Sequence, residues 1–187
     1  MAAVERADGG DILVVPVDCA SYALLQRLTI GLHATLGHTA VVAGWDLSPQ
    51  FAREPARGQY NSSLILAELF RRRTDPSARI LGVTDVDLFA PVLTYVFGEA
   101  QMRGPAAVVS TFRLRPELYG LSPDPELLAR RLLVESVHEL GHTAGLTHCH
   151  TSGCAMIGST YAEEIDLKGP GLCESCRGVF ESVFLGK

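Results

Sequence analysis

Apolar positions in the first quarter of the chain follow two different periods. The continuous apolar run 12–17 predicts a buried strand, which follows a loose leader over residues 1–11. Leucines then recur at helical intervals across residues 21–36, and this spacing predicts an amphipathic helix that ends at Gly37. A second apolar run, 41–45, predicts another buried strand. This order of strand, helix and strand favours parallel neighbours in an α/β sheet.

The next part of the chain continues the alternation of helices and strands. Residues 46–61 are mostly polar and hold two prolines, so we expect a loop there. Apolar pairs one turn apart across residues 62–73 predict a second helix, and the run 79–88 predicts a third strand. Gly82 lies inside that strand and indicates a close backbone approach.

Two further strands are predicted at residues 92–97 and 106–114. A short connection through Gly98 and Gly104 joins them, so we expect the two strands to pair antiparallel. Pro91 is tolerated best at the edge of a sheet, and we therefore place 92–97 at the edge. The predicted fold is an α/β (α+β) domain whose mixed sheet has an antiparallel edge strand.

A long helix is predicted to begin at Asp124, because aspartate favours the N-cap and Pro125 the first helical position. Apolar residues continue at helical spacing as far as Val137, and Gly145 is placed to end the helix. Regular patterning is then lost until residues 173–185, which predict a C-terminal helix.

The composition is that of one globular domain. The chain has 187 residues, of which 47% are hydrophobic and 20% are charged. Its net charge of −5 argues against nucleic acid as a partner, which would require a basic surface. No run approaches the ~20 apolar residues of a membrane span, and the N-terminus has no signal-peptide pattern. We therefore expect a cytoplasmic protein, a monomer, whose thiols stay reduced.

Three histidines and one acid form the first cluster with chemical potential. His138 and His142 are four residues apart, which places both imidazoles on one face of the predicted helix. Gly145 lets the chain reverse, so that His148 returns as a third ligand. Three neutral histidines leave one coordination position open, as in catalytic zinc sites. With Glu139 as the general base for a zinc-activated water, the pattern predicts amide hydrolysis.

Four cysteines form the second cluster. Cys149 and Cys154 are separated by four residues and Cys173 and Cys176 by two, which suits a structural Cys₄ zinc site. The alternative is two buried or redox-active pairs, because Cys-x-x-Cys also occurs in thiol oxidoreductases; no predicted strand precedes Cys173 as that motif requires. Since His148 and Cys149 are adjacent, the structural metal is expected to clamp the segment that carries the third catalytic ligand.

The remaining cysteine and histidines are expected to have structural roles. Cys19 is interpreted as a small buried residue after the first strand. His33 and His38 are expected to bond to the backbone. The same holds for His150, with a supporting contact behind the metal ligands as the weaker alternative.

The pattern HExxHxxGxxH from His138 to His148, followed by a methionine, is the metzincin signature. Met156 is the candidate for the methionine turn beneath the metal, and a plain core methionine is the alternative. Cys149 directly after the third histidine, the run Cys-Ala-Met and the final cysteine pair resemble archaemetzincins. The segments RGQYNSSLIL, GVTDVDLF, VFGEAQ and AAVVSTFRL are also similar to that family, so the resemblance covers most of the chain from Arg57 onward.

The resemblance implies a metzincin-like twisted mixed sheet over an active-site helix, with two zinc ions, one catalytic and one structural. It implies one catalytic domain, with an upper subdomain at 1–145 and a lower one at 146–187. By analogy, the substrate lies extended along the predicted edge strand. The run Leu93-Thr94-Tyr95 departs from the more polar residues expected there, which affects this edge. Tyr161 is a candidate for stabilising the oxyanion, although a rim aromatic is the favoured interpretation.

Three functions are consistent with these clusters. The leading hypothesis is a zinc metallopeptidase that acts on small or unfolded peptides. A zinc-containing protein that binds peptides but hydrolyses them poorly is the runner-up, and the presence of Glu139 argues against it. A thiol-redox protein ranks last, because it leaves the three histidines unexplained.

Overall fold

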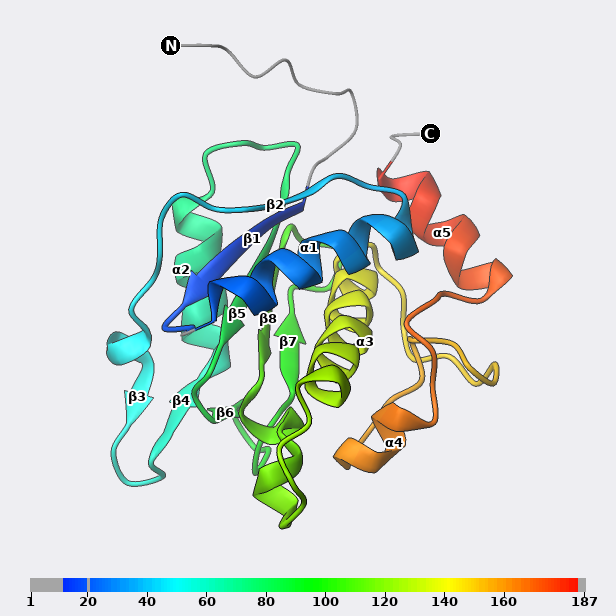
Figure 1. The fold of residues 1–187 in the computed structure, drawn as a ribbon. Coiled ribbons are helices and arrows are strands. Elements are labelled where there is room, and N and C mark those ends of the chain that lie inside the picture. The colour runs from blue at the N-terminus through cyan, green and yellow to red at the C-terminus, as the bar shows by residue number, and fades with distance from the viewer. Residues whose placement is uncertain (1–11, 20, 185–187) are drawn as a thin grey trace.

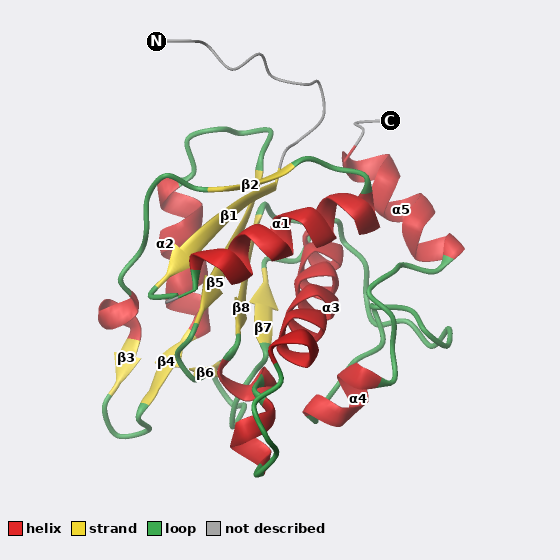
Figure 2. Cartoon of the chain, in the orientation of Figure 1, coloured by secondary structure: helices red, strands yellow, loops and turns green. Residues whose placement is uncertain are grey.

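The computed structural model describes residues 12–19 and 21–184. The predicted leader at residues 1–11 and the last residue of the predicted C-terminal helix lie outside these ranges. Figure 1 shows a twisted sheet with helices on both of its faces, and Figure 2 shows how the strands gather at the centre.

The main sheet has five strands in the order β2-β1-β5-β8-β7. Their bounds are β1 (Ile12–Val17), β2 (Ala40–Val42), β5 (Arg79–Thr84), β7 (Gly98–Ala100) and β8 (Ala106–Ser110). Neighbouring strands from β2 to β8 are parallel, and β7 pairs antiparallel with β8 at the edge. The predicted mixed sheet with an antiparallel edge strand is confirmed.

Alternate residues of the sheet face two different helix layers. α1 (Tyr22–Leu36) and α3 (Pro125–Thr143) cover one face, where Val14 belongs to the larger core cluster. α2 (Ser62–Arg72) covers the other face, where Val15 belongs to the second cluster. Figure 1 shows α3 running beside β7, so the helix with the predicted ligands lies against the sheet edge.

Gly82 lies in the middle of β5, where α2 packs on the sheet. A Cβ at this position would come within 2.7 Å of Leu69 Cδ1 and 3.1 Å of Val17 Cγ2. The close approach indicated by the sequence is therefore present, and the approaching group is a side chain of α2. A residue larger than glycine would push this helix away from the sheet.

A second, three-stranded sheet was not expected from the sequence. The segment predicted as a loop at 46–61 contains a 3₁₀ helix (Pro49–Ala52) and the antiparallel pair β3 (Arg53–Glu54) and β4 (Gln59–Asn61). β6 (Leu88–Phe89) pairs parallel with β4 and completes this sheet.

The prediction of one strand at 79–88 is therefore wrong. β5 ends at Thr84, and a bend with polar residues carries the chain out of the main sheet before β6 begins. The prediction that 92–97 is the edge strand is also wrong. Val92 has a φ of 66°, and Val96 forms only an isolated bridge with Leu88 of the second sheet. Pairing with β8 starts at β7, so the edge strand lies directly after the predicted one.

The C-terminal half follows the predictions more closely. β8 is shorter than the predicted strand 106–114, because the chain turns into two 3₁₀ helices, Phe112–Leu114 and Pro116–Tyr119. A short α4 (Ala162–Asp166) interrupts the stretch that had no predicted pattern, and α5 (Glu174–Phe184) is the predicted final helix. Within the described ranges, no helix combines the length and apolar character needed to cross a membrane.

Candidate active site

Helix α3 carries two predicted ligands and the predicted base. Asp124 caps its N-terminal end, because its carboxylate accepts hydrogen bonds from the backbone amides two and three residues later. The helix then continues to the site and buries His138 and Glu139, which are only 5% and 6% exposed. Both side chains are therefore withdrawn from bulk water.

His138 and His142 each hold one ring nitrogen against a backbone carbonyl. Nδ1 of His138 lies 2.8 Å from Ala155 O, and Nδ1 of His142 lies 2.7 Å from Leu146 O. A neutral imidazole that donates through Nδ1 keeps a lone pair on Nε2. The two Nε2 atoms are 3.0 Å apart, close to the ~3.3 Å between two nitrogens bound at ~2.0 Å to a tetrahedral zinc. Two facing lone pairs repel unless a cation accepts both, so the donor set fits a metal ion.

His148 completes the cluster from outside the helix. Gly145 has a φ of 89°, which few other residues adopt, and it turns the chain back toward α3. The ring of His148 then lies 5.2 Å from that of His138 and 5.3 Å from that of His142, measured between centroids. One nitrogen of each histidine lies within 4.8 Å of the others. The structure brings together the three histidines that the spacing predicted.

The surroundings of His138 and His142 favour the neutral form of both imidazoles. Burial lowers the pKa of His138 to about 3, and the nearby cation Lys168 acts in the same direction. Burial also lowers the pKa of His142. Neutral imidazole is the form that binds metal, so His138 and His142 need no deprotonation to bind one at physiological pH.

Lys168 lies beside the candidate site, and the sequence patterning did not indicate it. Its side chain is 1% exposed, and Nζ donates hydrogen bonds to Ile157 O at 2.6 Å and Ala155 O at 3.3 Å. The same Nζ lies 3.2 Å from the carboxylate of Glu135, which is also buried. Because Ala155 O also accepts from His138, Lys168 and this ligand share one backbone group.

Glu139 lies directly beneath the edge strand. A Cβ added to Gly98 of β7 would come within 2.7 Å of Glu139 Cγ and 2.8 Å of its Oε1. Burial raises the pKa of the Glu139 carboxyl well above its ordinary value, and the carboxylates of Glu135 and Glu99 add to this rise. A cation on the neighbouring histidines acts in the opposite direction and favours the ionised form.

Met156 lies beneath the turn of α3 that carries His138 and His142. It is fully buried, and a Cβ at Gly141 would come within 2.3 Å of its Sδ. Glycine at this position therefore lets the sulfur approach the helix backbone closely. The role of Met156 as the methionine turn stays a prediction, and Gly141 was not singled out from the sequence.

The four cysteines predicted as zinc ligands also come together. One sulfur from each of Cys149, Cys154, Cys173 and Cys176 lies within 4.8 Å of the others, and all are free thiols. Sγ of Cys149 and Sγ of Cys173 are 3.8 Å apart. That distance is far too long for a disulfide and equals the ~3.8 Å between sulfurs placed ~2.3 Å from one tetrahedral zinc. The backbone N–H of Cys176 lowers the pKa of Cys173 to about 6, whereas burial raises the pKa values of Cys154 and Cys176.

Backbone hydrogen bonds connect the two clusters. The amide of Cys149 donates to Met156 O at 2.9 Å, and the amide of Ala155 donates to Gly171 O at 2.9 Å. The segment after His148 is thus held on one side by the methionine turn and on the other by the cysteine-bearing loop. These bonds link the segment between the two clusters, and the clamping of His148 by a metal at the cysteines stays a prediction.

A cavity of about 680 Å³ opens above the histidines. Its upper rim is formed by residues 93–100, its lower rim includes Ser159 and Thr160, and the histidines, Glu135 and Glu139 line its floor. Tyr161 is not part of this lining; it is 61% exposed, directly before α4. Its proposed role at the oxyanion stays a prediction that none of these contacts supports.

The residues expected to be structural lie outside the cavity lining. Nδ1 of His33 lies 3.2 Å from His38 O, and the ring of His38 packs 4.7 Å from that of Phe184. His150 is exposed, and burial raises the pKa of the Cys19 thiol. The His33 contact agrees with the expected bond to the backbone, whereas Cys19 is half-buried rather than buried, and the expectation for His150 stays a prediction.

The chain is similar to known proteins along most of its length. The model of Peptidase family M54 matches residues 57–181. The archaemetzincin of Methanocaldococcus jannaschii is 37% identical over 180 residues, which cover 92% of this chain and 97% of that protein. The archaemetzincin of Methanopyrus kandleri is 44% identical over 128 residues, or 68% of this chain and 69% of that protein.

Solved structures give the same picture. The crystal structure of the Methanopyrus kandleri archaemetzincin superposes with a TM-score of 0.80 at 34% identity and covers 97% of this chain and 98% of that one. A zinc-dependent peptidase from Methanocorpusculum labreanum superposes with a TM-score of 0.83 at 28% identity and covers 90% of this chain and 99% of that one.

Proposed function

The chain belongs to peptidase family M54, the archaemetzincins, and is a zinc-dependent metallopeptidase, and from this premise we propose which of its residues bind zinc and cleave the peptide bond. His138, His142 and His148 hold the catalytic zinc, and Glu139 is the general base. The observation that carries this assignment is the 3.0 Å distance between two Nε2 atoms whose Nδ1 partners are backbone carbonyls.

The catalytic roles follow from the positions of these side chains. When bound, zinc supplies a Lewis acid that polarises a carbonyl and lowers the pKa of water. Glu139 accepts the proton of the attacking water and delivers it to the leaving amine. Because Glu139 lies against Gly98, its carboxylate is next to a peptide that runs along β7. Such a peptide adds one strand to the sheet edge, and the free backbone groups of β7 hold it in register.

A second zinc bound by Cys149, Cys154, Cys173 and Cys176 has a structural role in this proposal. The donor set is closed and consists of four sulfurs, which leaves no position for a substrate. The chain would therefore bind two zinc ions. The second ion stabilises the lower subdomain, residues 146–187, against the upper subdomain, residues 1–145, within one catalytic domain.

The proposal extends to the partners and the compartment. Free thiols and an all-cysteine metal site suit the reducing cytoplasm. The net charge of −5 disfavours nucleic acid as a partner. We propose a monomer whose substrates are small or unfolded peptides, because an extended backbone is what β7 can bind.

Two measurements on the purified protein test this proposal. Metal analysis is expected to give about two zinc ions per chain, and a value near one would remove one of the two sites. Incubation with a peptide library, followed by mass spectrometry, is expected to reveal cleavage products. A protein that retains zinc and binds peptides without cleaving any of them would be the peptide-binding alternative.

A further inference from the structure

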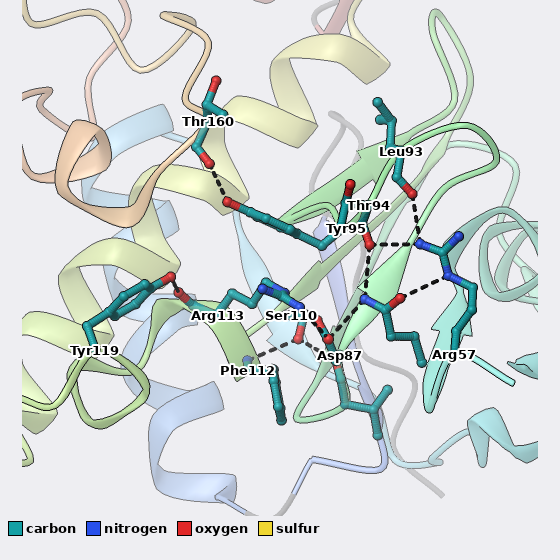
Figure 3. A network of polar contacts seen from close by, with 12 residues as sticks. Arg57, Asp87, Leu93, Thr94, Tyr95, Ser110, Phe112, Arg113, Tyr119 and Thr160 are labelled. Atoms are coloured by element: carbon teal, nitrogen blue, oxygen red, sulfur yellow. Dashed lines mark hydrogen bonds and ion pairs between the residues drawn. The ribbon is translucent and has the colours of Figure 1, made fainter. Parts of the chain in front are cut away.

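Tyr95 spans the cavity from its upper rim to its lower rim. It lies in the connection before β7, and its hydroxyl donates a 2.6 Å hydrogen bond to the carbonyl oxygen of Thr160. Both residues line the cavity. Figure 3 shows the Tyr95 side chain extending to Thr160, away from the sheet. One side chain therefore joins the two rims at this end of the cavity.

The direction of the Tyr95 ring is fixed by its neighbours. The guanidinium of Arg113 lies 4.0 Å from the ring centroid, and the Phe97 ring packs edge-on at 5.7 Å. Asp87 holds Arg113 through two hydrogen bonds of 2.6 and 2.7 Å. Partial burial raises the pKa of Tyr95, so its hydroxyl stays protonated and remains a donor at neutral pH.

The backbone before Tyr95 is also held in place. Arg57 donates to two carbonyls of this connection at 3.0 and 2.9 Å, the second of which is Thr94 O. Gln59 donates to the same Thr94 O at 3.1 Å and to Asp87 at 3.0 Å. Figure 3 shows that these bonds form one network with Arg113. The tyrosine is thus positioned before any substrate arrives.

The acceptor on the lower rim is fixed as well. The carboxylate of Glu164 accepts hydrogen bonds from the amides of Thr160 and Tyr161 at the start of α4. Since the acceptor for Tyr95 is a backbone carbonyl, the contact does not depend on the side chain of Thr160.

The contact lies a short distance from the catalytic position. Gly98 marks that position on the rim, because Glu139 lies against it. Tyr95 is three residues earlier, and three residues span at most ~10 Å of backbone, so this part of the rim begins within ~10 Å of Gly98. A peptide that runs along this rim covers the distance with about three residues.

We propose that the Tyr95–Thr160 contact closes this end of the cleft and selects substrates by length, favouring peptides that end within about three residues of the cleaved bond on the Tyr95 side. A longer chain must break the hydrogen bond and displace a ring that is packed on two sides. This inference rests on the proposed function, because it takes the cavity over the histidines as the peptide site.

The test uses two series of labelled peptides that share one core sequence. One series is lengthened residue by residue at the N-terminal side of the cleaved bond and the other at the C-terminal side. With the zinc-loaded wild type, kcat/KM is expected to fall about tenfold beyond the third residue in one series only. Tyr95→Phe keeps the ring but removes the hydrogen bond, so it should raise kcat/KM for the longer peptides about fivefold. Tyr95→Ala should abolish the dependence on length.

Tyr119→Phe is the matched control. The Tyr119 hydroxyl donates a 2.8 Å hydrogen bond to Arg113 O in the same network, but this bond does not cross the cavity. The control variant should therefore keep the wild-type dependence on length, and thermal unfolding establishes that each variant is folded. Equal cleavage of all lengths by the wild type, or an unchanged dependence in Tyr95→Ala, overturns the inference.

A measurement of peptide binding distinguishes failure of this inference from failure of the proposed function. The same peptides are titrated into the zinc-loaded Glu139→Gln variant and followed by fluorescence anisotropy, where the Kd should depend on length as kcat/KM does. Length-dependent binding without cleavage by the wild type would overturn the proposed function and support the closed cleft. Cleavage by the wild type without any dependence on peptide length would overturn the closed cleft and support the proposed function.

Discussion

Lys168→Met removes a buried charge while keeping a long, flexible side chain. The substitution leaves the carboxylate of Glu135, whose side chain is 5% exposed, without the ammonium that lies 3.2 Å away. It also leaves Ile157 O without its 2.6 Å donor and removes one of the two donors to Ala155 O. The variant therefore tests whether this cation stabilises the turn that orients His138.

The expected cost is large because a single charge stays behind. Breaking a buried ion pair by removing one partner costs about 3–5 kcal/mol, a major share of the ~5–15 kcal/mol that stabilises a typical domain. The double variant Lys168→Met/Glu135→Leu removes both charges, so only the unpaired carbonyls remain, at about 1–3 kcal/mol. Adding Glu135→Leu to the lysine variant should therefore restore stability.

The interaction between the two side chains is measured by urea unfolding at one fixed concentration of free zinc. The four proteins compared are the wild type, Lys168→Met, Glu135→Leu and the double variant. The zinc concentration is held constant because zinc binding itself adds to the free energy of unfolding. The two substitutions should show a coupling energy of about 2 kcal/mol or more, with the double variant more stable than Lys168→Met alone. If the losses in unfolding free energy of the two single variants sum to that of the double variant within about 0.5 kcal/mol, the ion pair does not stabilise the site as we infer.

Three further substitutions test individual contacts. Gly98→Ala brings a Cβ within 2.7 Å of Glu139 Cγ, so peptide cleavage should fall about a hundredfold with zinc retained; turnover near the wild-type rate would contradict the contact. Gly141→Ala places a Cβ 2.3 Å from Met156 Sδ and should cost about 1–3 kcal/mol in urea unfolding, whereas an unchanged midpoint would argue against close packing. Cys173→Ser should remove one zinc per chain and lower the affinity of the histidine site for zinc, as measured by chelator competition. An unchanged affinity of the histidine site would show that the two sites are independent.

The elements with strong periodicity could be predicted from the sequence. The helix with His138 and Glu139 was predicted because leucines repeat at helical spacing before them and Asp124-Pro125 marks its start. The grouping of the three histidines was predictable because they lie within eleven residues and follow the geometry of one helix and one glycine turn. Local rules were sufficient where neighbours in sequence are also neighbours in space.

The remaining features depend on contacts between distant segments. β7 contains Gly98 and Glu99, which have low strand propensity, and it pairs because β8 presents a free edge. Lys168 lies in a polar stretch 33 positions after Glu135, and no local pattern indicates that it is buried. Gly98 and Gly141 are required by side chains from other elements, and the second sheet is built from strands of two or three residues.

The central claim is that Glu139 cleaves peptides bound above the three histidines. The most direct test compares the cleavage rate of one library-derived peptide by the wild type and by Glu139→Ala, each with its zinc content measured. The variant should retain about two zinc ions per chain and lose activity by a factor of about 10²–10⁴. Cleavage by a zinc-replete variant at the wild-type rate would contradict the assignment of the general base.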